Sequence, residues 1–307
     1  MPGREFEPTG IMGQQIFGLP VDREILFSNH KKIYKKRIEK RQRKLIVKIH
    51  FLKPFLKRGE KILLVTTGYS PLASIAQYLT GFLFVYLKRC LFVFTNYRVL
   101  HIPVTPAYKY KNAIAQIAYA GCRSLALKGG TLVADYGKLG KSEKFRGVPV
   151  SERRKIKMLL GQLPISGTDN DTADRIHLCP NCTHRLEAGK YVCENCRQKF
   201  KSKLAARIIA VIMPGGGYFY TRHYLIGALN ALLEVLLISY LVYIAVTSGI
   251  PQKNVKESLY YMVPLALIYL TLKIISVIHA THFIDEFIPK EKLLKPNGNS
   301  RANPNSN

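Results

Sequence analysis

Hydrophobic positions change their spacing along the chain, and each spacing predicts a different kind of element. Between residues 31 and 58, mainly apolar positions recur at steps of four and three, which predicts a helix with one apolar stripe. The positions of this stripe are Ile38, Gln42, Leu45, Ile49 and Leu52. Pro54 is expected to end the helix.

From residue 59 to residue 163, short apolar runs rich in β-branched and aromatic side chains alternate with turn residues, which predicts an antiparallel sheet. Residues 72–87 carry no charge and could dip into a membrane. They are fewer than the roughly 20 residues that a span needs, so a buried strand is favoured. Residues 151–163 predict a closing helix with Ser151 as its N-cap.

The last third of the chain holds two long apolar runs. Residues 224–247 and 259–281 are each long enough to cross a bilayer, and the short link between them predicts an antiparallel hairpin. Lys and Arg crowd the N-terminal side of this hairpin and recur in the tail. By the positive-inside rule, both ends are expected in the cytoplasm and the link at 248–258 outside.

These patterns divide the chain into successive parts. The predicted parts are an N-terminal segment with a basic helix (1–58), a β domain (59–163), a linker (164–175), a cysteine-rich module (176–201), a membrane region (204–284) and a cytoplasmic tail with a disordered end (285–307). The N-terminus lacks the pattern of a secretory signal, so the first parts are also expected in the cytoplasm.

Positive charge dominates the composition, with 47 Lys and Arg against 19 Asp and Glu. Such an excess predicts attraction to an anionic membrane or to nucleic acid. Residues 31–58 concentrate it, with thirteen Lys or Arg and the single acid Glu39. The candidate contacts to lipid or phosphate are Lys35, Lys36, Arg37, Lys40, Arg41, Arg43 and Lys44. The helix can be a solvated one packed on its own domain, a membrane contact or, less favoured, a nucleic-acid contact.

The most specific chemical signal is CPNCTHRLEAGKYVCENC, residues 179–196. A Cys-x-x-Cys turn lets two sulfurs reach one ion, and two such turns complete a tetrahedral shell. The four predicted metal ligands are Cys179, Cys182, Cys193 and Cys196. The module resembles a zinc ribbon, which implies one Zn²⁺. Four thiolates leave no position for water, so the ion is expected to be structural, with His177 and His184 as bystanders.

Two short stretches of the β domain, RGEKILLV (58–65) and LFVFTNYRVLHI (91–102), resemble the GRAM and bacterial pleckstrin-homology-like families. In these families a Gly-Glu precedes the first strand, and a Thr-Asn-x-Arg turn precedes a later one. The resemblance implies an antiparallel β-barrel with a C-terminal helix, which docks on membranes or proteins and is generally not an enzyme. Thr95, Asn96 and Arg98 are interpreted as turn residues rather than ligands.

Residues 204–230 resemble the entrance of a TM2 domain, in which a small apolar helix runs into a Gly-rich turn and an aromatic and basic patch. The family's Phe-Tyr-Leu-Gly is replaced here by His-Tyr-Leu-Ile-Gly at 223–227. This segment is expected to be interfacial or re-entrant rather than a third span.

Two charges lie inside the proposed spans. Glu234 is thirteen residues before Thr247 and Lys273 is fourteen after Leu259, so they lie at similar depth and are candidates for a buried ion pair. A structural lock between helices is favoured over a functional role. A second metal site is the less favoured interpretation of the polar residues His223, His279, His282 and Glu286.

The sequence contains no nucleophile elbow, HExxH, nucleotide loop or dinucleotide fingerprint. The absence of these motifs favours a non-enzymatic adaptor or scaffold that contacts anionic lipids or a protein partner. Together, the predicted elements and the family resemblances imply a multidomain α+β membrane protein of the bacterial inner membrane. One alternative is a membrane-tethered nucleic-acid binder. Another is a subunit of a membrane enzyme or transporter that uses Glu234 and Lys273.

Overall fold

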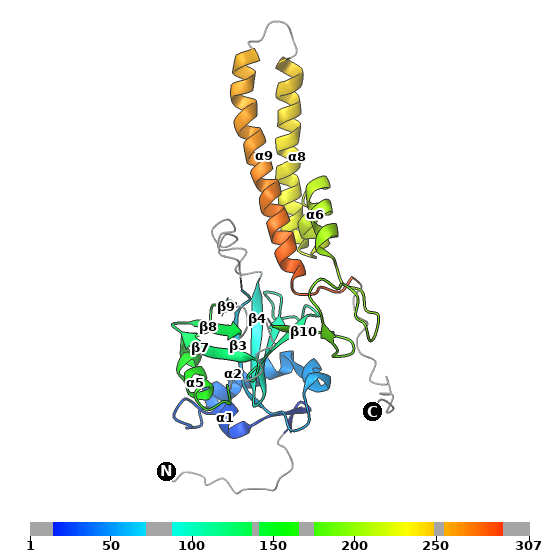
Figure 1. Ribbon diagram of the computed structural model, residues 1–307. Coiled ribbons are helices and arrows are strands. Elements are labelled where there is room, and N and C mark those ends of the chain that lie inside the picture. Colours follow the sequence, from blue (N-terminus) through cyan, green and yellow to red (C-terminus); the bar gives the residue numbers. More distant parts are fainter. Residues whose placement is uncertain (1–14, 72–87, 137–140, 166–174, 249–254, 291–307) are drawn as a thin grey trace. The chain divides into compact units, whose positions relative to one another are not determined.

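The computed structural model describes residues 15–71, 88–136, 141–165, 175–248 and 255–290 (Figure 1). The chain divides into two compact units. The first comprises Met1–Pro71, Lys88–Tyr110 and Ala115–Ile176, and the second comprises Leu72–Leu87, Lys111–Ile114 and His177–Asn307. The predicted strand at 72–87, most of the predicted linker, the centre of the link between the two long apolar runs and the end of the tail lie outside the described residues.

The first unit opens with short elements and one longer helix. These are β1 (Gln15–Ile16), β2 (Leu19–Pro20), α1 (Arg23–Phe27), α2 (Lys36–Lys48) and the 3₁₀ helix η1 (His50–Phe55). The side chain of Asp22 caps α1, accepting a hydrogen bond from the Ile25 amide at 3.0 Å. Lys155 holds the other end of this helix, because its ammonium donates to the carbonyls of Leu26 and Ser28 at 3.1 and 2.6 Å.

Seven further strands of this unit form two antiparallel groups. The first group pairs in the order β6-β5-β4-β3, and its strands are β3 (Ile62–Tyr69), β4 (Arg89–Thr95), β5 (Arg98–Pro103) and β6 (Ile114–Ala118). The second pairs in the order β7-β8-β9, with β7 (Cys122–Lys128), β8 (Thr131–Tyr136) and β9 (Ser142–Phe145). In the first group Val93 lies opposite both Val65 and Leu100, which fixes the register.

The two groups share one core and meet at one corner. The amide of Tyr69 at the end of β3 donates to the carbonyl of Arg146 at 2.8 Å, directly after β9. Phe92, Phe94, Leu132 and Phe145 pack together in the core. The described strands form antiparallel sheets, as expected, but they do not close into the barrel that the family resemblance implied.

The closing helix α5 spans Val150–Leu160 and buries Ile156, Leu159 and Leu160 against the same core. The predicted N-cap at Ser151 is wrong, because the helix begins earlier and its N-cap residue is Pro149. Ser151 lies inside the first turn, where its hydroxyl accepts a hydrogen bond from Arg41 at 3.1 Å.

The apolar stripe of α2 faces its own unit. Of the predicted stripe, Gln42, Ile49 and Leu52 are buried and Ile38 and Leu45 are partly exposed, and Ile46 is buried as well. The prediction that Pro54 ends the helix is wrong, because α2 ends at Lys48 and Pro54 lies inside η1. The side-chain amide of Gln42 bonds both backbone groups of Val65 on β3, at 2.9 and 3.0 Å. The stripe is therefore unavailable for insertion into a bilayer, and the basic face of α2 points outward.

The Gly-Glu and Thr-Asn-x-Arg stretches meet in one buried network at the start of β3. Glu60 accepts hydrogen bonds from the Arg98 guanidinium at 2.8 and 2.9 Å and from the Thr95 hydroxyl at 2.8 Å. The Asn96 amide bonds the backbone on either side of Glu60, at Lys61 N (2.8 Å) and Gly59 O (3.1 Å). These residues thus form an internal structural joint.

The second unit contains a small cysteine module followed by helices. Its elements are β10 (Ile176–Leu178), β11 (Arg185–Leu186), α6 (Lys203–Ile212), α7 (Gly216–Tyr220), α8 (Tyr224–Ser248) and α9 (Val255–Ile284). Within this unit α8 and α9 run side by side (Figure 1). Two segments, Tyr224–Thr247 and Tyr260–Ile284, are long and apolar enough to span a membrane.

Candidate functional site

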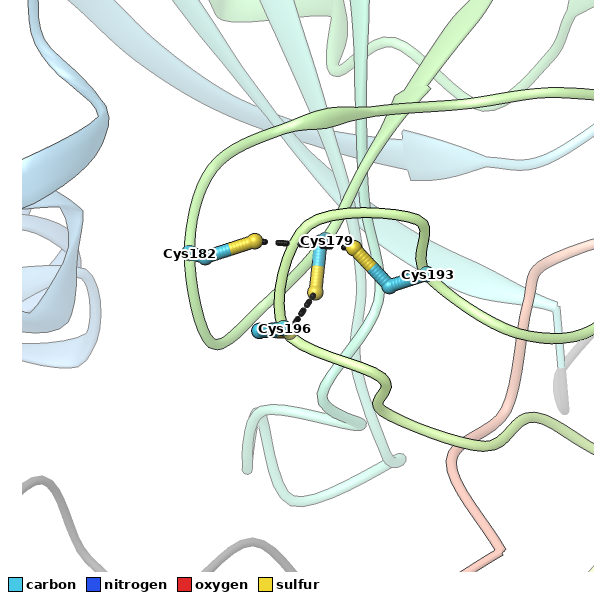
Figure 2. A group of neighbouring side chains, drawn as sticks. All are labelled: Cys179, Cys182, Cys193 and Cys196. Carbon is cyan, nitrogen blue, oxygen red and sulfur yellow. Dashed lines mark hydrogen bonds between the residues drawn. The ribbon is translucent and has the colours of Figure 1, made fainter. Parts of the chain in front are cut away.

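The four predicted cysteine ligands come together in the second unit (Figure 2). Their sulfur atoms all lie within 4.8 Å of one another, and two pairs, Cys179 with Cys196 and Cys182 with Cys193, are 3.5 Å apart. No disulfide joins them. Cys179 and Cys193 are buried, whereas Cys182 and Cys196 are partly exposed. This cluster can hold one metal ion.

The two Cys-x-x-Cys turns repeat the same backbone pattern. In the first, the amide of Thr183 donates to the carbonyl of Cys179 at 2.9 Å, and the Cys179 amide donates to the carbonyl of His184 at 2.8 Å. The residues Arg197, Cys193 and Gln198 repeat these bonds in the second turn at 3.0 and 2.9 Å.

A left-handed residue closes each turn, Thr183 with φ 62° and Arg197 with φ 59°. Non-glycine residues adopt this conformation only rarely. Its occurrence at equivalent places in both turns indicates a backbone shaped to direct two sulfurs inward.

Backbone amides also favour the charged form of the sulfurs. The pKa of Cys196 is lowered to about 7, because the Gln198 amide and neighbouring side-chain donors outweigh the effect of burial, which acts in the opposite direction. The His184 amide lies in the equivalent place and lowers the pKa of Cys182, but burial outweighs it there and the net pKa of Cys182 is raised. Thiolates are the form of cysteine that binds metals.

The cysteine module has little apolar core of its own. Leu186, Phe200 and Phe287 are buried around the cysteines, and Phe200 meets Phe287 edge to face at 5.7 Å. His177 packs on the Phe287 ring at 4.9 Å, and His184 contributes backbone groups to the turns. Neither histidine belongs to the candidate ligand group.

Glu234 on α8 and Lys273 on α9 also come together. Their Oε2 and Nζ atoms lie 2.7 Å apart, and the two side chains are 0% and 9% exposed. The contact is between opposite charges rather than an aligned hydrogen bond. Asn230, one turn before Glu234, donates to its other carboxylate oxygen at 2.5 Å.

Lys273 also reaches the C-terminal end of α6. Its ammonium donates to the carbonyls of Ala210 and Met213 at 3.2 and 3.3 Å. The last carbonyls of a helix have no partner within it and carry partial negative charge. Lys273 satisfies the Ala210 carbonyl and adds a second donor to the Met213 carbonyl, which also accepts from the Gly216 amide at 2.9 Å. Glu234 balances the charge of Lys273, so the cluster joins three helices.

The glycine-rich turn after α6 makes this contact possible. Gly215 has φ 64°, and a Cβ there would lie 2.2 Å from the carbonyl oxygen of Gly227. A Cβ at Gly217 would lie 2.9 Å from Ala210 and 3.1 Å from Ala280. Only glycine allows such close packing, which resembles the small-residue contacts of membrane helices. With ten residues, α6 is too short to span a bilayer.

His223 and the two histidines near the end of α9 each contact a different side chain. His279 bonds the Tyr218 hydroxyl, His223 stacks on Phe283 at 3.9 Å, and His282 lies 3.8 Å from Asp285. Among the described residues, the four cysteines form the sole group placed to hold a metal. The alternative of a second site at these histidines is not favoured by their placement.

The basic candidates on α2 separate into two sets. Arg37, Lys40, Arg41 and Lys44 line a groove on the outer face of the helix, together with Lys48 and Tyr108. Lys35, Lys36 and Arg43 lie outside that lining, and Arg43 pairs with Glu39 at 2.7 Å. Tyr108 lies 60 residues after Lys48, so no local pattern predicted its place in the groove.

Comparisons of the chain with protein-family models, curated proteins and solved structures found no match.

Proposed function

We propose that this protein is a membrane-anchored, non-enzymatic scaffold that holds a basic folded domain near an anionic leaflet or a protein partner. The observation that carries the proposal is the exposure of large apolar side chains on two helices of membrane-spanning length. These side chains, each at least half exposed, include Leu225, Leu229, Leu232, Leu236, Tyr260, Leu267 and Leu270. Burial of such surface in lipid removes it from water, so α8 and α9 serve as a transmembrane hairpin.

Orientation follows from the charges that flank the hairpin. The basic N-terminal parts and the tail remain on the cytoplasmic side of a bacterial inner membrane, and the short link faces outward. The segment α6–α7 enters the membrane from the same side without crossing it, in the manner of a TM2-like entrance. Lys273 supports this arrangement because it satisfies the carbonyls where α6 ends.

We further propose that the bound metal is one structural Zn²⁺. In a tetrahedral site with Zn–S bonds of about 2.3 Å, neighbouring sulfurs lie about 3.8 Å apart, close to the 3.5 Å of two pairs here. A module this small folds only with its ion. The zinc ribbon then gives a fixed shape to the chain that precedes α6.

The first unit is proposed to be a pleckstrin-homology-like domain. Its order of four strands, three strands and one helix, around a shared core, supports this assignment. The exposed basic face of α2 is its proposed contact with anionic lipid, each Lys or Arg near the surface contributing about 1 kcal/mol.

The test uses the full-length protein in nanodiscs of neutral or anionic lipid, with amine-reactive labelling of lysines read by mass spectrometry. The proposal expects Lys36, Lys40 and Lys44 to be protected in anionic nanodiscs, whereas the exposed Lys128 keeps its reactivity. Protection only when RNA is added, in either lipid, would support the nucleic-acid alternative instead. Equal labelling under all conditions would remove both and direct the search to proteins.

A further inference from the structure

The outer face of α2 and Tyr108, from the connection between β5 and β6, border an open groove of about 460 Å³. Five cations line it, namely Arg37, Lys40, Arg41, Lys44 and Lys48. Leu45 and Tyr108 complete the lining, which contains no acidic side chain.

The groove is rigid on its helical side. The opposite face of α2 is fixed in the core by Ile46 and by the two bonds between Gln42 and Val65. Arg41 is held by Glu152 at 3.2 Å and by Ser151 at 3.1 Å. The helix backbone therefore holds the five cationic residues at fixed spacings, and the Arg41 side chain is positioned before any ligand arrives, which lowers the entropic cost of binding.

Like charges at i, i+4 repel on a helix by roughly 0.2–0.5 kcal/mol a pair. Lys40, Lys44 and Lys48 follow one another at this spacing, as do Arg37 and Arg41. The nearby acid Glu39 already accepts bonds from Tyr34 and Arg43. A bound anion would relieve this repulsion.

Tyr108 contributes an aromatic side chain to the edge of the groove. Its backbone φ is 58°, a strained value for a bulky side chain. A tight turn holds it there, since the Tyr108 amide donates to the Thr105 carbonyl and the Lys109 amide donates to the Thr105 hydroxyl, at 2.8 and 3.0 Å. The Arg89 guanidinium lies 4.9 Å from the ring centre. The turn and the Arg89 contact fix an aromatic ring at the edge of the basic groove.

We propose that this groove binds an anion that carries two or more closely spaced phosphate groups. The guanidinium of Arg37 can bind phosphate oxygens in bidentate fashion, and Lys40 and Lys44 supply point charges one turn apart. This ligand class rests on the proposed function, in which the basic face of α2 is a contact surface. The anion can be a soluble polyphosphate compound or the headgroup of a lipid with two phosphates.

The first experiment titrates inorganic tripolyphosphate into the full-length protein in neutral detergent micelles, at an ionic strength of about 0.15 M. The double variant Lys40→Gln/Lys44→Gln is compared with Lys128→Gln/Lys144→Gln, which makes the same change of charge at exposed sites outside the groove. Calorimetry is expected to show affinity lowered roughly tenfold or more by the first pair and little changed by the second. Tyr108→Ala is expected to weaken binding as well.

Equal loss of affinity in both double variants would overturn the inference, because diffuse charge rather than the groove would then bind the anion. Absence of binding to the unmodified protein would overturn it too. In that case, protection of the α2 lysines in anionic nanodiscs would still uphold the membrane scaffold.

The two sources of phosphate are separated in nanodiscs of neutral lipid with or without a lipid that bears two phosphates. Tripolyphosphate that competes with this lipid for the α2 lysines identifies the headgroup as the ligand. Tripolyphosphate binding without any lysine protection by the lipid supports the groove with a soluble ligand, and contradicts only the membrane contact of the proposed function.

Discussion

A buried ion pair holds the start of β3. Glu60 and Arg98 are 0% and 5% exposed, and they lie 2.8 Å apart. Removal of two charges from water costs several kcal/mol for each ion unless hydrogen bonds replace the lost solvent. Here the Thr95 hydroxyl and the Lys57 amide, both 2.8 Å from the carboxylate, supply those bonds.

Replacement of Glu60 by Gln should destabilise the first unit by about 3–5 kcal/mol, because Arg98 would remain buried without its partner charge. Chemical denaturation of the full-length protein in detergent, followed by the fluorescence of a probe in unit 1, measures this change. The exposed Glu24 serves as the control, and Glu24→Gln should leave the unfolding midpoint unchanged. An equal effect of both substitutions would contradict the structural role of the pair.

The same pair predicts a pH dependence. Burial acts to raise the pKa of Glu60, but the hydrogen bonds and charge of Arg98 and the Lys57 amide outweigh it and hold the pKa below its usual range. The carboxylate therefore stabilises the fold above the pKa it has in the unfolded chain, and this contribution is lost as the pH falls through the lowered folded value. Unfolding curves between neutral and acid pH should lose this component in Glu60→Gln.

The metal site makes a prediction at the same scale. Cys196→Ser should abolish stoichiometric zinc binding, since one of four ligands is lost, whereas His184→Ala should retain it because His184 contributes only backbone groups. Metal analysis of the purified protein gives the zinc content. In the proposed zinc-dependent module, protease cleavage between residues 176 and 201 should accelerate in Cys196→Ser and after chelation. Zinc retained by Cys196→Ser would contradict the proposed ligand set.

At the scale of elements, α2 protects an edge of the first sheet. β3 is the last strand in the order β6-β5-β4-β3, so half of its backbone groups point away from β4. Gln42 fills part of that edge, because its amide donates to and accepts from Val65 as a further strand would. The helix is thereby fixed to the sheet by polar bonds as well as by its apolar stripe.

Gln42→Met should retain much of the packing volume and lose both bonds, which leaves the Val65 amide and carbonyl buried without a partner. The expected loss is about 1–3 kcal/mol for each group. Val47→Met, at a position 45% exposed on the same helix, is the matched control and should change stability little. Hydrogen exchange at the Val65 amide provides a direct readout, and an unchanged exchange rate in Gln42→Met would count against this role.

These elements show how far sequence patterns reach. The spacing of four and three placed Gln42 on the inner face of α2, but it carried no information on the strand that the amide meets. β9 was not predicted, because among Ser142–Phe145 only Phe145 is buried. Its pairing depends on β8 rather than on its own composition. The N-cap of α5 was misplaced at Ser151 because the helix begins at Val150, directly after Pro149, without any side-chain cap. A rule based on capping side chains therefore selects the wrong residue.

On the scale of the whole molecule, the two units are stabilised in different ways. The first unit surrounds an apolar core with two sheets and a helix. The second leaves most of its apolar helical surface exposed, and its contacts include the cysteine cluster and the buried Glu234–Lys273 pair. The similar depth of Glu234 and Lys273 in the two apolar runs predicted that they would form a pair. The carbonyls of α6 that Lys273 also binds were not predicted, since they depend on the turn at Gly215–Gly217.

Single and double variants of Glu234 and Lys273 distinguish a structural role of this ion pair from a catalytic or transport role. Glu234→Gln or Lys273→Met alone leaves one charge in an apolar region, with an expected loss of about 3–5 kcal/mol. The double variant removes both charges, so its loss should be smaller than the sum of the two, with a coupling of about 0.5–3 kcal/mol. It should still be less stable than the unmodified protein, because the Ala210 carbonyl loses its donor and the Met213 carbonyl keeps only the Gly216 amide.

Thermal unfolding in detergent micelles with zinc present measures these differences, and Thr271→Val is the control because its hydroxyl bonds only the local carbonyl of Leu267. A catalytic or transport role would give a different result: Glu234→Gln would keep its stability, and the double variant would be no better than the sum of the single ones. Positive coupling would instead mean that the two charges exist to hold a short helix in the membrane. The hairpin would then act as an anchor, and partner binding would belong to the basic first unit.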